Sequence, residues 1–134
     1  MTRGGILVVT LALLVAAPAF AGSAGPATRL AISVWPRGTA DPLVRHYRLG
    51  CDPAAGTVPQ PARACRALAR LAAPFAPVPP HTVCAQIALG PQEAVVTGLL
   101  RGRRVQTRLS LRDSCEIERW RRVSLVVPGF PRSA

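Results

Sequence analysis

Residues 81–98, HTVCAQIALGPQEAVVTG, join an exposed loop to the first arm of a hairpin, and the rest of the chain is organised around them. Two prolines precede this stretch and Gly90-Pro91 interrupts it. Because proline lacks a backbone N–H and disfavours helix in the residue before it, we expect residues 82–89 to be extended and exposed. If Cys84 fixes this loop covalently, the loop has little conformational entropy left to lose when it binds another protein.

The segment after Pro91 has the pattern of a β-hairpin. Residues 93–100 and 104–111 form its arms, and Arg101-Gly102-Arg103 supplies the turn, where glycine reaches positive φ. In the second arm, one face carries Val105, Thr107, Leu109 and Leu111, and the other carries Arg104, Gln106, Arg108, Ser110 and Arg112. This alternation predicts a sheet with one face packed on the core and one face exposed to solvent.

Three further segments are expected to be strands. From Thr28, apolar residues alternate with small or polar ones until Pro36, which is typical of a half-buried strand. Residues 43–49 predict a second strand that pairs antiparallel with the first, and residues 52–59 predict a loop rich in turns. Residues 123–127 predict the last strand.

Two short helices complete the predicted elements. Pro61 opens the first, which Pro74 ends, and its inward face consists of Cys65, Leu68, Ala69 and Ala72. Asp113 and Glu116 have the spacing of a capping box at the start of the second, which would bury Ile117 and Trp120. The expected fold is therefore α+β, with a five-stranded antiparallel sheet and two short helices.

The first 21 residues have the pattern of a secretory signal peptide: Arg3 near the start, an apolar run, and Ala19-Phe20-Ala21 as the cleavage site. A membrane anchor is the alternative, but the run is shorter than the roughly 20 residues that a spanning helix needs. We expect a secreted, extracellular protein with no membrane span after cleavage, whose single domain comprises residues 22–134.

Four cysteines, an even number in a small exported chain, predict two disulfides. The sequence allows three pairings of Cys51, Cys65, Cys84 and Cys115. Zinc is the alternative, but there is no Cys-x-x-Cys pair, and the two histidines, His46 and His81, lie outside ligand spacing. We expect no metal and no cofactor.

The basic residues are seventeen arginines and no lysine, against six acids. Nucleic-acid binding is one interpretation of this charge. The arginines are scattered, however, and lack the interleaved aromatic residues on which single strands stack. We therefore expect no nucleic-acid partner. No nucleophile elbow accompanies the histidines, which disfavours a hydrolase.

Three segments carry a resemblance to a known family: GPQEAVVTGLLRGRRV (90–105), DSCEIERW (113–120) and the cysteine-bearing loop. Together they resemble the Streptomyces subtilisin inhibitor family over most of the chain after Thr28. In that family a cysteine lies two residues before the residue that enters the specificity pocket of the protease. The resemblance therefore implies a non-enzymatic inhibitor of subtilisin-like serine proteases.

Residue by residue, the resemblance matches Cys84 to the family's cysteine, Gln86 to the pocket residue, and Gln86–Ile87 to the bond offered to the protease. Ala85 and Ala88 would support the loop. It also implies the disulfides Cys51–Cys65 and Cys84–Cys115, and a homodimer formed through the sheets. Gln86 is uncharged, whereas the family usually has Met, Lys or Arg here. An alternative is a non-inhibitory scaffold whose arginine surface binds anionic envelope polymers.

Overall fold

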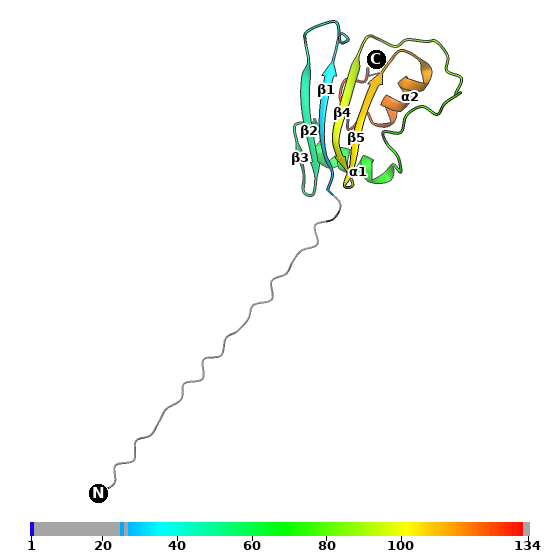
Figure 1. Ribbon diagram of the computed structural model, residues 1–134. Coiled ribbons are helices and arrows are strands. Elements are labelled where there is room, and N and C mark those ends of the chain that lie inside the picture. The colour runs from blue at the N-terminus through cyan, green and yellow to red at the C-terminus, as the bar shows by residue number, and fades with distance from the viewer. Residues whose placement is uncertain (2–24, 26, 133–134) are drawn as a thin grey trace.

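The computed structural model describes Met1, Gly25 and residues 27–132 of the 134-residue chain. Five antiparallel strands form one sheet in the order β3-β2-β1-β4-β5 (Figure 1). The elements are β1 (Arg29–Trp35), β2 (Arg45–Cys51), β3 (Ala54–Gly56), α1 (Pro61–Arg70), β4 (Glu93–Leu100), β5 (Arg103–Ser110) and α2 (Ser114–Arg122). The predicted α+β class, with its five strands and two helices, is confirmed.

The predicted signal peptide, residues 1–21, lies outside the described residues except for Met1. Among the helices of the described part of the chain, none has the length and apolar character needed to cross a membrane.

The central strand β1 confirms the first predicted strand, and its neighbour β2 confirms the second. Ile32 lies opposite Tyr47 of β2 on one side and opposite Val96 of β4 on the other. The covered face of the sheet and the helices share one core: Leu30, Ile32, Val34, Leu49, Val58, Ala64, Leu68, Phe75, Ala94, Val96, Leu109, Leu111, Trp120, Val123, Val126 and Val127. Helix α1 packs against β2 and β3, and α2 packs against β5.

The β4–β5 hairpin is tighter than predicted. Leu100 pairs directly with Arg103, so Arg103 belongs to β5, and the turn is Arg101-Gly102 alone. Both turn residues have positive φ, 51° and 77°, as a tight hairpin turn requires. Gly98 is equally constrained, because a Cβ there would lie 2.1 Å from the Arg29 carbonyl oxygen. The predicted alternation of β5 is confirmed, with Leu109 buried and Arg104 and Arg108 exposed.

Helix α1 begins at Pro61 as predicted but ends at Arg70, four residues before Pro74. Its buried residues are Ala64 and Leu68, while Cys65 is partly buried. Ala69 and Ala72, which were expected to face inward, are exposed. In an alanine-rich segment, alanine does not distinguish the buried side of a helix from its exposed side. The sequence pattern therefore predicts the wrong alanines on the buried side.

Two segments differ from the expected elements. Residues 52–59 contain the short strand β3, which pairs Ala55 with Gly50; its sequence Ala-Ala-Gly has no alternation that could predict a strand. Residues 123–127 are not a strand. They form turns after α2, in which Val126 and Val127 both donate backbone hydrogen bonds, of 2.8 Å, to the Val123 carbonyl. Three buried valines spaced i, i+3, i+4 suit a helical turn as well as a short apolar strand.

Both implied disulfides are present. Cys51 bonds Cys65 and joins the end of β2 to α1, with a Cα–Cα distance of 5.6 Å. Cys84 bonds Cys115 and joins the exposed loop to α2, with a Cα–Cα distance of 5.5 Å. They close separations of 14 and 31 residues, which the loop-entropy relation converts to about 3 and 4 kcal/mol of stabilisation.

Candidate functional site: the loop between α1 and β4

The loop from Thr82 to Leu89 has no regular secondary structure and stands at the end of the molecule that carries α2 (Figure 1). Three of its apolar side chains are exposed: Val83 by 97%, Ile87 by 62% and Leu89 by 50%. A monomer gains nothing from holding large apolar side chains in water, and a group of them marks a surface that contacts another molecule. The exposure predicted for this loop is confirmed.

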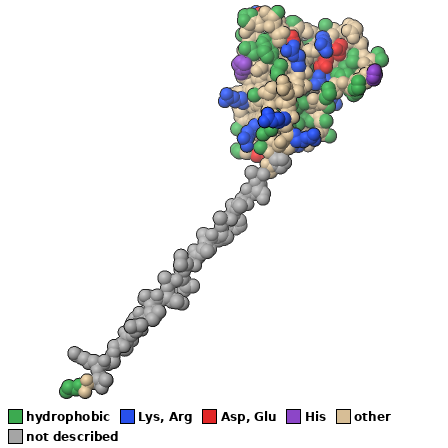
Figure 2. All heavy atoms as spheres, in the orientation of Figure 1, with side chains coloured by type: hydrophobic (Ala, Val, Ile, Leu, Met, Phe, Trp, Pro, Cys, Tyr) green, Lys and Arg blue, Asp and Glu red, His purple; other side chains and the backbone are tan. Residues whose placement is uncertain are grey.

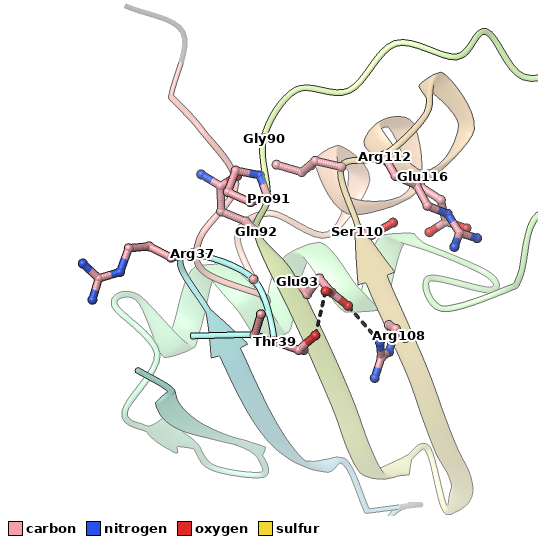
Figure 3. Close-up of a pocket in the computed structure, with 13 residues that line it drawn as sticks. Arg37, Thr39, Gly90, Pro91, Gln92, Glu93, Arg108, Ser110, Arg112 and Glu116 are labelled. Atoms are coloured by element: carbon pink, nitrogen blue, oxygen red, sulfur yellow. Dashed lines mark hydrogen bonds and ion pairs between the residues drawn. The ribbon is translucent and has the colours of Figure 1, made fainter. Parts of the chain in front are cut away.

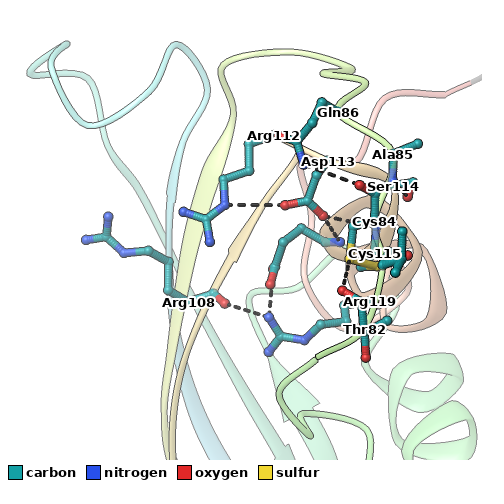
Figure 4. Close-up of polar contacts among 12 residues, drawn as sticks. Thr82, Cys84, Ala85, Gln86, Arg108, Arg112, Asp113, Ser114, Cys115 and Arg119 are labelled. Atoms are coloured by element: carbon teal, nitrogen blue, oxygen red, sulfur yellow. Dashed lines mark hydrogen bonds and ion pairs between the residues drawn. A yellow bond between two sulfur atoms is a disulfide. The ribbon is translucent and has the colours of Figure 1, made fainter. Parts of the chain in front are cut away.

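The N-terminal half of the loop is anchored to the start of α2 by three contacts (Figure 4). The first is the disulfide between Cys84 and Cys115. The backbone N–H of Ala85 donates to the Ser114 hydroxyl at 2.9 Å, and the Ser114 N–H donates to the Ala85 carbonyl at 3.0 Å. Ala85 therefore has both of its backbone polar groups bound. No sequence pattern singles out Ser114.

The chain bends at Gln86 instead of running fully extended. The Ile87 N–H donates to the Ala85 carbonyl at 2.9 Å, which closes a three-residue turn with Gln86 at its centre. The Gln86 side-chain amide donates to the Cys84 carbonyl at 3.3 Å. The prediction of an extended loop is thus wrong at this one residue. The bend makes the loop convex at the Gln86–Ile87 bond.

The C-terminal half of the loop is anchored by one hydrogen bond. The Leu89 N–H donates to the carbonyl of Leu111, at the end of β5, at 2.8 Å. Leu111 is completely buried, so this acceptor is part of the core. Between the anchored residues Ala85 and Leu89, the turn bond from Ile87 to Ala85 is the backbone hydrogen bond recorded for the exposed residues Gln86, Ile87 and Ala88, and it lies within the loop itself.

At the start of α2, the predicted N-cap is confirmed, but the rest of the predicted capping box is not. The Asp113 carboxylate accepts hydrogen bonds of 3.0 Å from the N–H groups of Cys115 and Glu116, which makes Asp113 the N-cap. The Glu116 side chain does not complete a capping box. It forms an ion pair of 2.7 Å with Arg119 instead. The cap orients the first turn of α2, and that turn carries both Ser114 and Cys115.

Arg119 holds the surroundings of the loop together, and the sequence did not point to it. Its side chain is 10% exposed. The guanidinium donates to the Ala76 carbonyl at 2.9 Å, to the Thr107 hydroxyl at 2.9 Å and to the Arg108 carbonyl at 3.3 Å, besides Glu116. One side chain therefore links the proline-rich segment before the loop, strand β5 and α2. A buried arginine with this many acceptors fixes their relative positions.

The proline-rich segment turns into the loop at His81, whose φ is 65°. Both the N–H and the hydroxyl of Thr82 donate to the Pro79 carbonyl, at 3.3 and 2.7 Å. This local turn redirects the chain immediately before Cys84. His81 is exposed and lies at the bend.

An open depression of about 620 Å³ lies beside the C-terminal anchor (Figure 3). Gly90, Pro91 and Leu111 line it together with polar residues from the β1–β2 connection and from β5. In it, Glu93 accepts a hydrogen bond from Thr39 at 3.1 Å and forms an ion pair with Arg108 at 2.8 Å. These contacts tie the β1–β2 connection to the start of β4, where the loop joins the sheet.

Within the described residues, the side chains of a possible catalytic triad and of a possible metal site do not form such sites. Ser33 and His46 are neighbours across β1 and β2, with Oγ and Nδ1 3.1 Å apart, but the described residues offer this pair no carboxylate partner. The sulfurs of Cys84 and Cys115 lie within 4.8 Å of a carboxylate oxygen of Asp113. Those sulfurs are bonded to each other, so they are not thiolate ligands.

Comparison with known proteins relates the chain to one family. The profile of the subtilisin inhibitor-like family matches residues 24–111. Among solved structures, Streptomyces caespitosus sermetstatin in complex with Bacillus licheniformis subtilisin is 29% identical, with a TM-score of 0.44, and the match covers 70% of this chain and 90% of that chain. No curated protein sequence matches the chain.

Proposed function

The chain belongs to the subtilisin inhibitor-like family, whose members are protease inhibitors and not enzymes, and from this we propose that it inhibits subtilisin-like serine endopeptidases through the Gln86–Ile87 bond. The observation that carries the proposal is the anchoring of the loop on both sides of this bond. Ala85 is bound to Ser114 on one side, and Leu89 is bound to Leu111 on the other.

The proposed mechanism is binding with slow turnover. The loop enters the active-site cleft of the protease, and Gln86, at the centre of the bend, occupies the specificity pocket. If the protease cleaves Gln86–Ile87, both new ends stay attached to the same rigid sheet. Religation then competes with release, because the two ends remain at high effective concentration. Ala85 and Ala88 present little bulk on either side of the bond.

The choice of target follows from the side chain of Gln86. An uncharged amide cannot pair with the buried carboxylate of a trypsin-type pocket, so trypsin gains no charge-assisted contact. A wider, less charged pocket of the subtilisin type accepts it. The exposed Ile87 and Leu89 add apolar contact area on the other side of the bond.

Secretion and pairing of two copies are part of the proposal. The signal-peptide pattern of residues 1–21 supports export to the extracellular space. A homodimer through the open sheet face would be isologous, so the open-face arginines Arg29, Arg48 and Arg104 would face the equally basic surface of the second copy. We therefore expect the dimer to form more readily at high ionic strength, where this repulsion is screened.

A titration of the purified mature protein against subtilisin and trypsin tests the function. We expect one equivalent to abolish subtilisin activity and to leave trypsin active. Retention of full subtilisin activity at equimolar protein would instead support the alternative, a non-inhibitory scaffold.

A further inference from the structure

Charge is divided between the two ends of the molecule. Five of the six acidic residues form an ion pair with an arginine, and all five pairs lie on α2 or at the end of the sheet near the loop: Arg37–Asp41, Arg108–Glu93, Arg112–Asp113, Arg119–Glu116 and Arg121–Glu118. In Figure 2 the acidic side chains in the upper part of the described body lie beside basic ones. At the loop end of the molecule every acidic residue is therefore neutralised by an arginine, and Arg45 and Arg122 remain there without an ion pair among the described residues.

The opposite end carries arginines without such partners. We define the arginine end by the exposed residues Arg29, Arg66, Arg70, Arg103 and Arg104. None of them forms an ion pair within residues 27–132, and Asp52 is the acid that lies near them, lining a hollow with Arg66. Figure 2 shows basic side chains in the lower part of the described body with little acidic colour among them.

These arginines form one surface because Arg101 joins the elements that carry them. The Arg101 guanidinium donates to the carbonyls of Leu68, of Leu71 at 2.8 Å and of Ala72 at 3.3 Å, at the C-terminal end of α1. Its backbone N–H donates to the Thr28 hydroxyl at 3.1 Å. The hairpin tip, the end of α1 and the start of β1 therefore meet, and the charges that they carry add up at one place.

We propose that the arginine end binds a linear anionic polymer with repeating phosphate groups and no bases, of the poly(glycerol phosphate) type. Arginine suits phosphate because its planar fork donates two hydrogen bonds at once. Release of counterions from such a polymer favours binding wherever several unpaired cations lie together. A nucleic acid fits less well, because the arginine end has no exposed aromatic side chain on which bases could stack.

Polymer binding and protease binding would be compatible. The eight residues of β4 separate the hairpin tip from the loop end, a distance of roughly 23 Å at the usual rise per residue. A polymer held at the hairpin tip leaves Gln86 accessible. The protein would then be an inhibitor retained on an anionic surface.

The first test compares two triple variants with the same change in net charge. One replaces Arg66, Arg103 and Arg104 by Gln; the matched control replaces Arg37, Arg112 and Arg121, whose side chains are 66%, 78% and 65% exposed. Affinity for immobilised poly(glycerol phosphate) is measured between about 0.05 and 0.2 M salt, the range over which such contacts weaken steeply.

We expect the first variant to bind at least about tenfold more weakly, and its slope of log affinity against log salt to fall by about three. The control should change by less than about threefold, the loss expected from long-range charge alone. Equal losses in both variants would overturn the proposal, because net charge and not the arginine end would then set the affinity. Thermal unfolding checks that both variants are folded.

The second test separates the polymer from other partners. The wild-type protein should bind poly(glycerol phosphate) more tightly than single-stranded DNA of equal charge, and should not bind neutral dextran. Tighter binding to DNA, or no binding to the phosphate polymer at low salt, would overturn the proposal. Subtilisin inhibition measured with and without saturating polymer should agree within about twofold. A protein that does not inhibit leaves the polymer measurements intact, so the two functions fail separately.

Discussion

The two sides of the Gln86–Ile87 bond are held by unequal means. On the N-terminal side, a disulfide and two hydrogen bonds join Cys84 and Ala85 to the first turn of α2. On the C-terminal side, a single hydrogen bond from Leu89 to Leu111 holds the chain before Gly90.

If Gln86–Ile87 is the bond offered to the protease, as proposed, this difference indicates which half of the loop limits religation. After cleavage, the segment that carries the acyl group cannot leave, because the disulfide holds it. The segment that begins at Ile87 can fray as far as Leu89 by breaking one hydrogen bond, which contributes about 1 kcal/mol. We call the N-terminal side, Cys84 and Ala85, the strong side, and the C-terminal side, Ile87 to Leu89, the weak side. The strong side should therefore determine stability and specificity. The weak side should determine how long a cleaved inhibitor remains effective.

Removing the disulfide of the strong side should have the largest effect. Replacing Cys84 and Cys115 by Ser removes up to about 4 kcal/mol of stabilisation and frees the acyl segment. We expect subtilisin to cleave the variant at Gln86–Ile87 and inhibition to disappear over time, whereas the intact protein should be nicked slowly and stay inhibitory. Mass spectrometry of the fragments identifies the cleaved bond, and the time course of residual protease activity measures the loss of inhibition.

The matched control for that variant is the other disulfide. Replacing Cys51 and Cys65 by Ser costs about 3 kcal/mol by the same relation and leaves the loop anchors in place. Below its unfolding temperature, this variant should remain inhibitory for as long as the wild type. If both double variants lose inhibition equally fast, the Cys84–Cys115 bond only braces the fold, and the comparison of the two sides fails.

Arg119 supports the strong side from behind. Replacing it by Met leaves Glu116 poorly solvated and without its partner, which should lower the free energy of unfolding by about 3 kcal/mol. It should also speed cleavage at Gln86–Ile87, because Ala76 and α2 lose their common link. Arg119→Lys keeps the charge but not the planar fork, so it should restore most of the stability and less of the resistance to cleavage. A variant that loses stability at an unchanged cleavage rate would restrict Arg119 to a structural role.

The residue at the centre of the bend tests specificity. Replacing Gln86 by Lys should bring trypsin inhibition into a measurable range, about ten- to a hundredfold stronger than wild type, since an ammonium can pair with the carboxylate of the trypsin pocket. Replacing the equally exposed Gln106 of β5 by Lys adds the same charge away from the loop and should change nothing. Trypsin inhibition constants for the three proteins test whether Gln86 enters the pocket. No gain for Gln86→Lys would mean that another residue does.

The sequence predicted the parts of this site that depend on local pattern. Alternation located β1 and the β4–β5 hairpin, and the capping-box spacing of Asp113 and Glu116 identified the N-cap. The resemblance supplied the cysteine pairing. The contacts that hold the loop, Ser114 with Ala85 and Arg119 with Ala76, join residues 29 and 43 apart in the chain, and no local pattern reports such pairs.

The wrong predictions have a common physical cause. Residues 54–56 and 123–127 are short and have small or uniformly apolar side chains. For such segments, tertiary contacts and not periodicity decide between strand and turn. The bend at Gln86 is set in the same way, because it depends on where Ser114 fixes the Ala85 carbonyl.

The smallest expected effect concerns the hydroxyl that binds the Ala85 N–H. Ser114→Ala removes one exposed hydrogen bond of about 1 kcal/mol and leaves the disulfide and the second hydrogen bond to Ala85 intact. Cleavage at Gln86–Ile87 should be about fivefold faster, while the thermal midpoint should fall by no more than a few degrees, since water can bind the freed N–H. Ser114→Thr keeps a hydroxyl at the same place and should restore the wild-type cleavage rate. Because the strong side retains its covalent bond, the Ala variant should still inhibit subtilisin at equimolar concentration in a short assay. A loss of inhibition as complete as that of the Cys84/Cys115 variant would show that the hydrogen bonds, and not the disulfide, hold the acyl segment.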